Sequence, residues 1–282
     1  MACWDNRGRH LIDLINWLNM NAAIKSESTM REELLPFVIR PAVTEQDYFK
    51  AVDIRHRAYA RHVPEFAASL RVAETADYED GSLVLLAEAK LDGSPLGTMR
   101  IQSNVNQPLH LEESITLPSW LQGASMLEAS RLAVELGAAG RLVRVALFKA
   151  CYFYCVEAPI DWMVITAREP LDRLYESLLF QDVLPGGGMV PIHHVGNIPH
   201  RVMALSVLDG YSAWAEANHP LFRFFFQTIH PDIRLSEIRN ARSIHRRAPE
   251  QLGHVLDDGG LPSTVASAPS EAIGTRYRSD RH

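Results

Sequence analysis

Residues 126–144 constrain the fold more than any other stretch, because a strand carrying polar residues runs there through glycines into a long apolar helix. Glu128, Ser130 and Arg131 stand among leucines, alanines and a valine. Burying such polar groups in a strand costs free energy unless they are paired or have a function. The composition of this strand is therefore the first indication of a functional site.

Two glycines follow this strand at the start of the helix. Gly137 and Gly140 allow the backbone to turn sharply and to leave amide N–H groups exposed at the helix N-terminus, which suits a phosphate or a pantetheine arm. Arg141 and Arg144 lie in the first helical turn, where the helix dipole disfavours cations, so binding of an anion would explain them. An ordinary turn with solvated arginines fits these residues slightly better when they are taken alone.

Charge and cysteine content argue against several classes of protein. A net charge of −6 over 282 residues does not fit a dedicated nucleic-acid binder, which needs a basic face. Cys151 and Cys155 lie four apart in an apolar helical pattern, which indicates core residues rather than a disulfide or a metal pair. Residues 11–20 mix Asp and Asn with apolar residues, so we expect neither a signal peptide nor a spanning helix, and a cytoplasmic protein.

The pattern divides the chain into three parts. Residues 1–35 are predicted to form a helical extension, residues 36–232 the folded domain, and residues 233–282 a basic and then disordered tail. The elements expected in the domain are strands at 37–40, 82–89, 96–101, 126–134, 162–167 and 200–207, and helices at 44–62, 142–157, 170–180 and 211–229. This order predicts an α/β fold, with a mixed sheet flanked by helices on both faces.

Four short motifs occur along these elements in a fixed order. They are Arg55-x-x-x-Tyr59, Asp77-x-x-Asp80, Gly97-x-x-Arg100 and Glu128-x-Ser130-Arg131. The order of the elements, with the glycine turn between the fourth strand and the long helix, resembles that of the GNAT-like acyltransferases. Within that clan, the chain is similar to the acyl-homoserine-lactone synthases and to the long-chain N-acyl amino acid synthases. The resemblance covers about residues 37–229 and implies the acyl-CoA N-acyltransferase (GNAT-like) fold.

The chain departs from the autoinducer synthases in one informative way. Those enzymes usually carry a tryptophan shortly after the aromatic residue of the first helix, and residues 61–65 contain none. The resemblance therefore implies first an N-acyl amino acid synthase, which moves a fatty acyl group to the amine of an amino acid. The alternatives are an autoinducer synthase, a short-chain acetyl-CoA N-acetyltransferase and a non-catalytic acyl-binding protein.

This reaction implies roles for several residues. An α-amine is mostly protonated near neutral pH, so a carboxylate has to take its proton, and Glu128 is the candidate base. The resemblance implies that backbone N–H groups hold the oxyanion where the strand at 126–134 diverges from the strand at 162–167. It also implies that Tyr175 protonates the departing thiolate, although a plain core tyrosine is at least as good an interpretation.

The remaining charged motif residues are candidates for substrate binding. Arg100 and Arg131 would each grip the carboxylate of an amino acid with two N–H groups. The alternative is that both form structural salt bridges with Asp77, Asp80 or Glu128. We predict that the acceptor amino acid is bound by Arg55, Asp77, Asp80, Arg100, Ser130 and Arg131. We predict that the acyl donor is bound by Leu136, Gly137, Gly140 and Arg141.

Partners follow from the same resemblance. The co-substrate is expected to be acyl carrier protein, through its phosphopantetheine, or acyl-CoA, with no tightly bound cofactor. His193, His194 and His200 lack the spacing of zinc sites, so we assign no metal site. The phenylalanines at 222–226 fit core packing, with an acyl groove or a dimer contact as alternatives. The basic segment 234–247 is expected to be a solvated tail, with contact to an acidic acyl carrier protein or a membrane surface as alternatives. This tail or the product would be the route to any membrane association.

Overall fold

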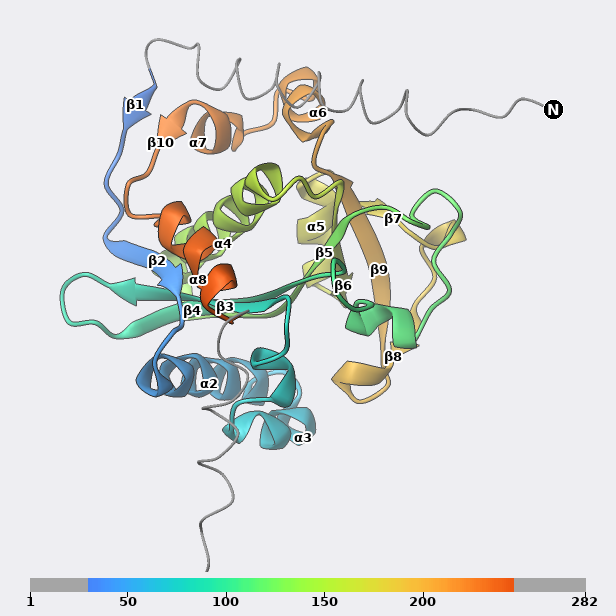
Figure 1. The fold of residues 1–282 in the computed structure, drawn as a ribbon, viewed down its shortest axis with the longest axis horizontal. Helices are drawn as coiled ribbons and strands as arrows, with labels where there is room; N and C mark the ends of the chain where they lie inside the picture. Colours follow the sequence, from blue (N-terminus) through green and yellow to red (C-terminus); the bar gives the residue numbers. More distant parts are fainter. Residues whose placement is uncertain (1–29, 246–282) are drawn as a thin grey trace, which may run out of the picture. The chain divides into compact units, whose positions relative to one another are not determined.

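The centre of the fold is a twisted eight-stranded sheet in the order β2-β3-β4-β5-β6-β9-β7, with β8 paired to β9 (Figure 1). This computed structural model describes residues 30–245, so the predicted N-terminal helix and the tail from residue 246 lie outside the described residues. Neighbouring strands run antiparallel except β5 and β6, which run parallel. The strands are β2 (Phe37–Pro41), β3 (Ser82–Ala89), β4 (Pro95–Ser103), β5 (Met126–Val134), β6 (Trp162–Ala167), β7 (Gln181–Asp182), β8 (Val190–Ile192) and β9 (Ile198–Ser206).

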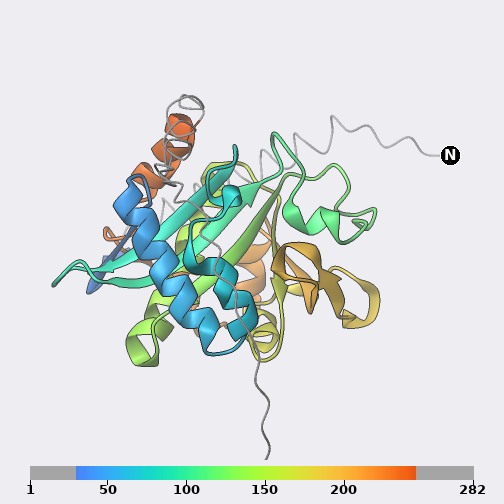
Figure 2. The same cartoon turned by 90° about the horizontal axis from the view of Figure 1, so that it is seen from below.

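Helices cover both faces of this sheet, as the sequence predicts. On one face lie α2 (Glu45–Ala60) and α3 (Pro64–Ala67), and on the other lie α4 (Gly137–Glu157) and α8 (Leu235–His245) (Figures 1 and 2). The shorter helices are α5 (Leu171–Ser177), α6 (Gly210–Glu216) and α7 (Phe222–Phe226). Within residues 30–245, no helix is long and apolar enough to cross a membrane.

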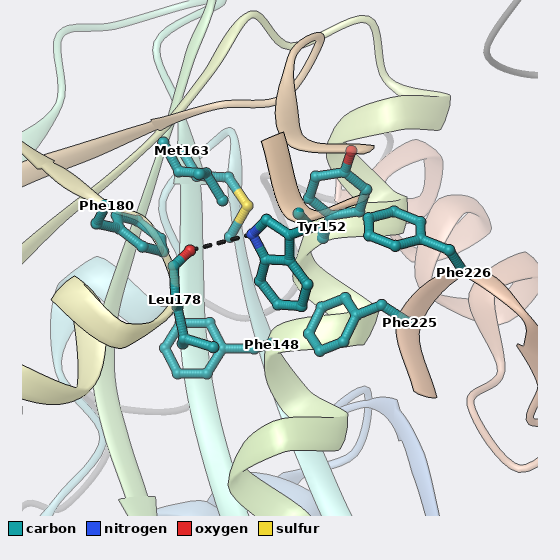
Figure 3. A pocket seen from close by; sticks show the side chains of 9 residues that line it. Phe148, Tyr152, Met163, Leu178, Phe180, Phe225 and Phe226 are labelled. Carbon is teal, nitrogen blue, oxygen red and sulfur yellow. Dashed lines mark hydrogen bonds between the residues drawn. The ribbon is translucent and has the colours of Figure 1, made fainter. Parts of the chain in front are cut away.

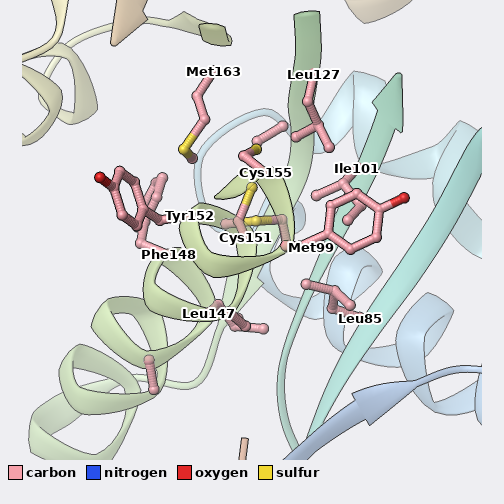
Figure 4. Close-up of a cluster of buried hydrophobic side chains, with 14 of the residues drawn as sticks. Leu85, Met99, Ile101, Leu127, Leu147, Phe148, Cys151, Tyr152, Cys155 and Met163 are labelled. Carbon is pink, nitrogen blue, oxygen red and sulfur yellow. The ribbon is translucent and has the colours of Figure 1, made fainter. Parts of the chain in front are cut away.

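The core lies between α4 and the sheet (Figure 4). Met99, Ile101 and Leu127 of the sheet are at most 1% exposed and belong to the same apolar cluster as α4. Cys151 and Cys155 are free and buried within α4, which confirms the prediction that they are core residues. Burial of this face, rather than helix propensity, stabilises α4.

Two irregularities of β5 shape the centre of the sheet. The register between β4 and β5 shifts between Thr98 and Arg100, and Arg131 has a φ of 52°. A residue that is not glycine adopts this left-handed conformation at a cost, and here it forms a β-bulge. Because of the bulge, Arg131 lies on the same face of β5 as Glu128 and Ser130, which is the face toward α2.

β5 and β6 also separate along their length, as the resemblance implies. They pair from Met126 to Ala129 on β5, opposite Trp162 to Ile165 on β6, and no further. The second half of β5 therefore has no hydrogen-bonded neighbour on its β6 side. Along this half, β5 pairs only with β4, and we call the stretch the opening between β5 and β6.

The glycine turn after β5 has a steric cause in the fold itself. Gly137 has a φ of 86°, which favours glycine. A Cβ atom on Gly140 would lie 1.7 Å from the backbone oxygen of Glu135, so no other residue fits there without moving the turn. α4 thus begins at Gly137, which is exposed to solvent and follows the half of β5 that does not pair with β6.

The C-terminal part differs from the expected single helix and solvated tail. Asn218 has a φ of 47°, and Pro220 follows it, so residues 211–229 divide into α6, α7 and the short strand β10 (Thr228–Ile229). β10 pairs with β1 (Arg31–Glu32). Ile238 of α8 is fully buried, so the expectation of a solvated tail is wrong for the start of this segment. Residues 31–35 and 233–241 therefore pack with the domain predicted over 36–232.

Candidate active site

Three arginines and two carboxylates form a buried cluster on the α2 face of the sheet. We call this group the arginine cluster, and it consists of Arg55 from α2, Arg100 from β4, Arg131 from β5, and Glu74 and Asp77 from the segment before β3. Four of the five were predicted from the motifs. Glu74 was missed, because it precedes the D-x-x-D motif in an irregular segment that no periodicity marks.

The contacts inside the arginine cluster are short and specific. Nη1 of Arg55 donates to both carboxylate oxygens of Asp77, at 2.8 and 2.7 Å. Nε and Nη2 of Arg131 each donate to Glu74 at 2.6 Å. Nη1 of Arg100 lies 3.2 Å from Glu74 and 3.4 Å from Asp77, while its Nε donates to Oγ of Ser130 at 3.3 Å. Of the partners proposed for these arginines, Arg100 contacts Asp77, whereas Arg131 pairs with Glu74, which was not among the predicted partners.

The arginine cluster carries one positive charge in excess, since three guanidinium groups face two carboxylates. Nε and Nη2 of Arg55 are buried and have no hydrogen-bond partner among the described residues. Burial alone would raise the pKa of Glu74, but the hydrogen bonds and charge of Arg131 and the other arginines outweigh it and lower this pKa to about 2. Within these five residues, the guanidinium charges thus exceed the carboxylate charges by one, and Glu128 is a further carboxyl group that feels the charges of Arg100 and Arg131.

Glu128 lies on the same face of β5 and is 1% exposed. Its Oε2 accepts a hydrogen bond from the amide of Leu111 at 3.1 Å, whereas its Oε1 has no hydrogen-bond partner among residues 30–245. Burial raises the pKa of this carboxyl above its ordinary value, and the Leu111 amide and the nearby positive charges oppose that rise only in part. A carboxyl with a raised pKa and a free oxygen has the properties of a general base for an ammonium group.

His194 is a second titratable group at this site. Its Nε2 lies 3.4 Å from Oε1 of Glu128, and neither ring nitrogen has a hydrogen-bond partner in the described chain. Burial and the charges of Arg131 and Arg100 lower its pKa to about 3, so the imidazole is neutral at ordinary pH. The sequence offered no sign of this contact, because His194 follows β8 in a loop far along the chain from β5.

The residues assigned to the donor side lie apart from the arginine cluster. Leu136 and Arg141 are exposed at the start of α4, beside Gly137. One turn further, the buried Nε of Arg144 has no partner within the described residues. Asp80 is not brought to the site, since it is exposed and its Oδ2 accepts a hydrogen bond from Asn106.

Tyr175 of α5 packs into the core on the α4 face. Its ring lies 5.3 Å from that of Phe148 and 5.4 Å from that of Phe180. Burial and the proximity of Tyr59 raise the pKa of its phenol, while the charge of Arg144 opposes this. The phenol therefore keeps its proton at ordinary pH.

A small apolar cavity of about 10 Å³ lies next to Tyr175, between α4 and the strands β6 and β9 (Figure 3). Phe148 and Phe180 belong both to this cavity and to the ring contacts of Tyr175. Nε1 of Trp214 donates to the backbone oxygen of Leu178 at 3.2 Å across it. The lining is apolar throughout, and its residues are Phe148, Tyr152, Met163, Leu178, Phe180, Leu205, Trp214, Phe225 and Phe226.

Comparison with known proteins identifies the family. The sequence profile of the N-acyl amino acid synthase FeeM family matches residues 50–206, a range that includes the arginine cluster, Glu128, Tyr175 and His194. The chain belongs to the N-acyl amino acid synthase FeeM family. It is therefore an N-acyltransferase. No curated protein sequence matches the chain.

Several solved structures are similar to this FeeM-family enzyme. FeeM, an N-acyl amino acid synthase from uncultured soil microbes, is 20% identical with a TM-score of 0.50, and the match covers 64% of this chain and 96% of FeeM. A GNAT-family acetyltransferase from Staphylococcus aureus is 14% identical with a TM-score of 0.41, over 61% of this chain and 99% of its own. The acyl-homoserine-lactone synthase LasI is 15% identical with a TM-score of 0.41, over 61% and 89%. The predicted GNAT-like fold is confirmed.

Within residues 30–245 of this FeeM-family enzyme, no group of three or more His, Cys, Asp or Glu side chains could hold a metal ion. His193 and His194 are neighbours in sequence but face different surroundings. The side chain of His193 is 69% exposed and contacts Glu113, whereas that of His194 is 9% exposed and faces Glu128. The two histidines therefore differ enough to serve as a site residue and its control.

Proposed function

We propose that this enzyme transfers a long-chain fatty acyl group from the thioester of an acyl carrier protein, or of acyl-CoA, to the amine of an amino acid. The observation that carries this proposal is the excess positive charge of the arginine cluster on the same face of the sheet as Glu128. A buried charge without a counter-ion is costly. The α-carboxylate of an amino acid supplies the missing negative charge, and it places the α-amine next to that carboxylate within reach of Glu128.

The acceptor and the acyl chain would then bind on opposite faces of the sheet. The acceptor binds on the α2 face, where Glu128 and the arginine cluster lie. The acyl chain lies on the α4 face, and the reacting thioester spans the opening between β5 and β6. Backbone N–H groups in the half of β5 that is not paired with β6 would stabilise the oxyanion of the tetrahedral intermediate.

The chemistry balances with the groups present. The ammonium group loses one proton to Glu128, and the resulting amine nitrogen attacks the thioester carbon. A C–N bond forms, the C–S bond breaks, and the thiolate leaves with both electrons of that bond. The second proton of the nitrogen passes to the thiolate through Tyr175, which donates its own proton and regains one. The products are an N-acyl amino acid, a thiol and one proton released to water.

The phosphopantetheine arm of the donor would bind at the N-terminus of α4, and the acyl chain would bind near the apolar cavity. The open N-terminus of α4 at Leu136, Gly137, Gly140 and Arg141 offers amide groups and a cation to a phosphopantetheine arm. The chain then passes Tyr175 toward the apolar cavity. Because a void of about 10 Å³ holds no more than one water, a long acyl chain displaces the side chains around Trp214 when it enters. Such thioesters place the reaction in the cytoplasm.

A matched pair of acceptors tests the proposal. With one acyl thioester, we expect leucine to be acylated with a kcat/KM about 100-fold higher than 3-methylbutylamine, which lacks only the carboxylate, because a charge-assisted contact is lost. Products are measured by mass spectrometry over a panel of amino acids and their decarboxylated amines. Equal kcat/KM values across all such pairs would show that the arginine cluster does not recognise the acceptor.

A further inference from the structure

A line of four titratable side chains connects Glu128 with the molecular surface. Glu128 lies on β5, His194 in the turn η5 (His193–Val195), His110 in the turn η3 (His110–Glu113), and Glu79 just before β3. Side-chain exposure rises steadily along the line, from 2% for Glu128 and 9% for His194 to 16% for His110 and 30% for Glu79. Four segments that are distant in sequence therefore bring acid and imidazole groups together in order of increasing access to water.

The inner pair is arranged to share a proton. Oε1 of Glu128 and Nε2 of His194 face each other at 3.4 Å, and both atoms are buried without a hydrogen bond among the described residues. Leaving both groups unpaired is costly, and a proton placed between them satisfies both atoms at once. Burial and the charges of Arg131 and Arg100 lower the pKa of His194 to about 3, so its imidazole is neutral. A neutral imidazole with its proton on Nε2 satisfies both atoms and leaves the Glu128 carboxylate able to accept one more proton.

The outer pair completes the connection. The rings of His194 and His110 are in contact, with their centroids 5.8 Å apart, so the two imidazoles are neighbours. Nε2 of His110 lies 2.8 Å from Oε2 of Glu79, whose carboxylate is partly exposed. The charged and titratable groups around His194 are thus Glu128 and Arg131 on β5, Arg100 on β4, and His110 on η3.

We propose that His194 and Glu128 act together as the proton acceptor for the substrate ammonium group, and that His110 and Glu79 carry this proton to water. This inference rests on the proposed acyl transfer and adds to it a route for the proton that the reaction releases. The ammonium proton moves to the Glu128–His194 pair, and the pair returns to its starting state by passing one proton through His110 to Glu79. The carbon, nitrogen and sulfur bonds change as described above.

The test compares His194→Ala with His193→Ala in the full chain. We expect His194→Ala to lower kcat about 100-fold, with the KM of the acyl thioester unchanged, because proton transfer slows while donor binding does not depend on the imidazole. Added imidazole is expected to restore part of the lost kcat. His193→Ala, which removes an exposed side chain, is expected to keep kcat within about twofold of the unaltered enzyme.

Two outcomes would overturn the proposed proton route from Glu128 and His194 through His110 to Glu79, which we call the relay. One is a kcat for His194→Ala equal to that of His193→Ala, and the other is a loss of kcat in folded His194→Ala that imidazole leaves unchanged. If His194→Ala does not fold, His110→Ala tests the outer step, with an expected loss of kcat that small buffer bases restore, and no such restoration rejects the relay. Failure of the proposed function would be recognised separately, because the unaltered enzyme would then acylate amines but no amino acid. In that case the same variants are compared with those amines as acceptors.

Discussion

Replacing Glu128 with glutamine is expected to lower kcat for N-acylation by about 100-fold or more, the usual range for losing a general base. Glutamine keeps the shape of the side chain and an oxygen that can accept from the amide of Leu111, but it cannot take a proton. Donor binding is therefore expected to remain nearly intact. The measurement is steady-state kinetics together with direct binding of a non-reactive acyl-thioester analogue.

Glu113→Gln is the matched control for this variant. Glu113 is a glutamate with a side chain that is 57% exposed and contacts His193, outside the arginine cluster. We expect its kcat to stay near that of the unaltered enzyme. Turnover by Glu128→Gln equal to that of Glu113→Gln would remove Glu128 as the base.

The second large effect concerns the stability of the arginine cluster. Glu74→Gln removes one of two carboxylates that face three guanidinium groups, so the excess charge rises from one to two. Breaking a buried ion pair on one side is strongly destabilising, and we expect the free energy of unfolding to fall by about 3 kcal/mol. Denaturant unfolding at neutral pH measures the change, with Glu113→Gln again as the exposed control.

The same residue predicts a pH dependence with a definite sign. The pKa of Glu74 is lowered from 4.5 to about 2, so its ionised form stabilises the fold. This contribution is fully present above pH 4.5 and is lost as the pH falls toward 2. Stability of the unaltered enzyme is expected to decline over this interval more steeply than that of Glu74→Gln. Identical acid profiles for the two proteins would contradict the account of the cluster.

Much of the site could be predicted from sequence because its residues lie on regular elements. Glu128 and Ser130 alternate with apolar residues along β5, and Arg100 pairs with Ser130 across the β4–β5 ladder. Strand periodicity alone would place Arg131 on the opposite face from Ser130. The E-x-S-R motif grouped Arg131 with Glu128 and Ser130, and the bulge that turns Arg131 to their face of β5 has no signature in the sequence.

Residues supplied by irregular segments could not be predicted. Glu74 and His194 reach the site from segments without helical or strand periodicity, and their partners on β5 are far away along the chain. The motifs also placed Asp80 with Asp77, although the chain turns between them and only Asp77 is buried. Likewise, the aromatic pattern of residues 211–229 predicted one helix, because hydrophobic periodicity does not register the break at Asn218 and Pro220.

The central claim is that the acceptor amine meets the thioester in the opening between β5 and β6, beside Glu128. A crystal structure of the enzyme with an N-acyl amino acid bound tests it most directly. We expect the amide nitrogen within hydrogen-bond distance of Glu128, the carboxylate against the arginine cluster, and the acyl chain on the α4 face. A product bound with its carboxylate away from the arginines, or with its amide outside the β5–β6 opening, would contradict the account.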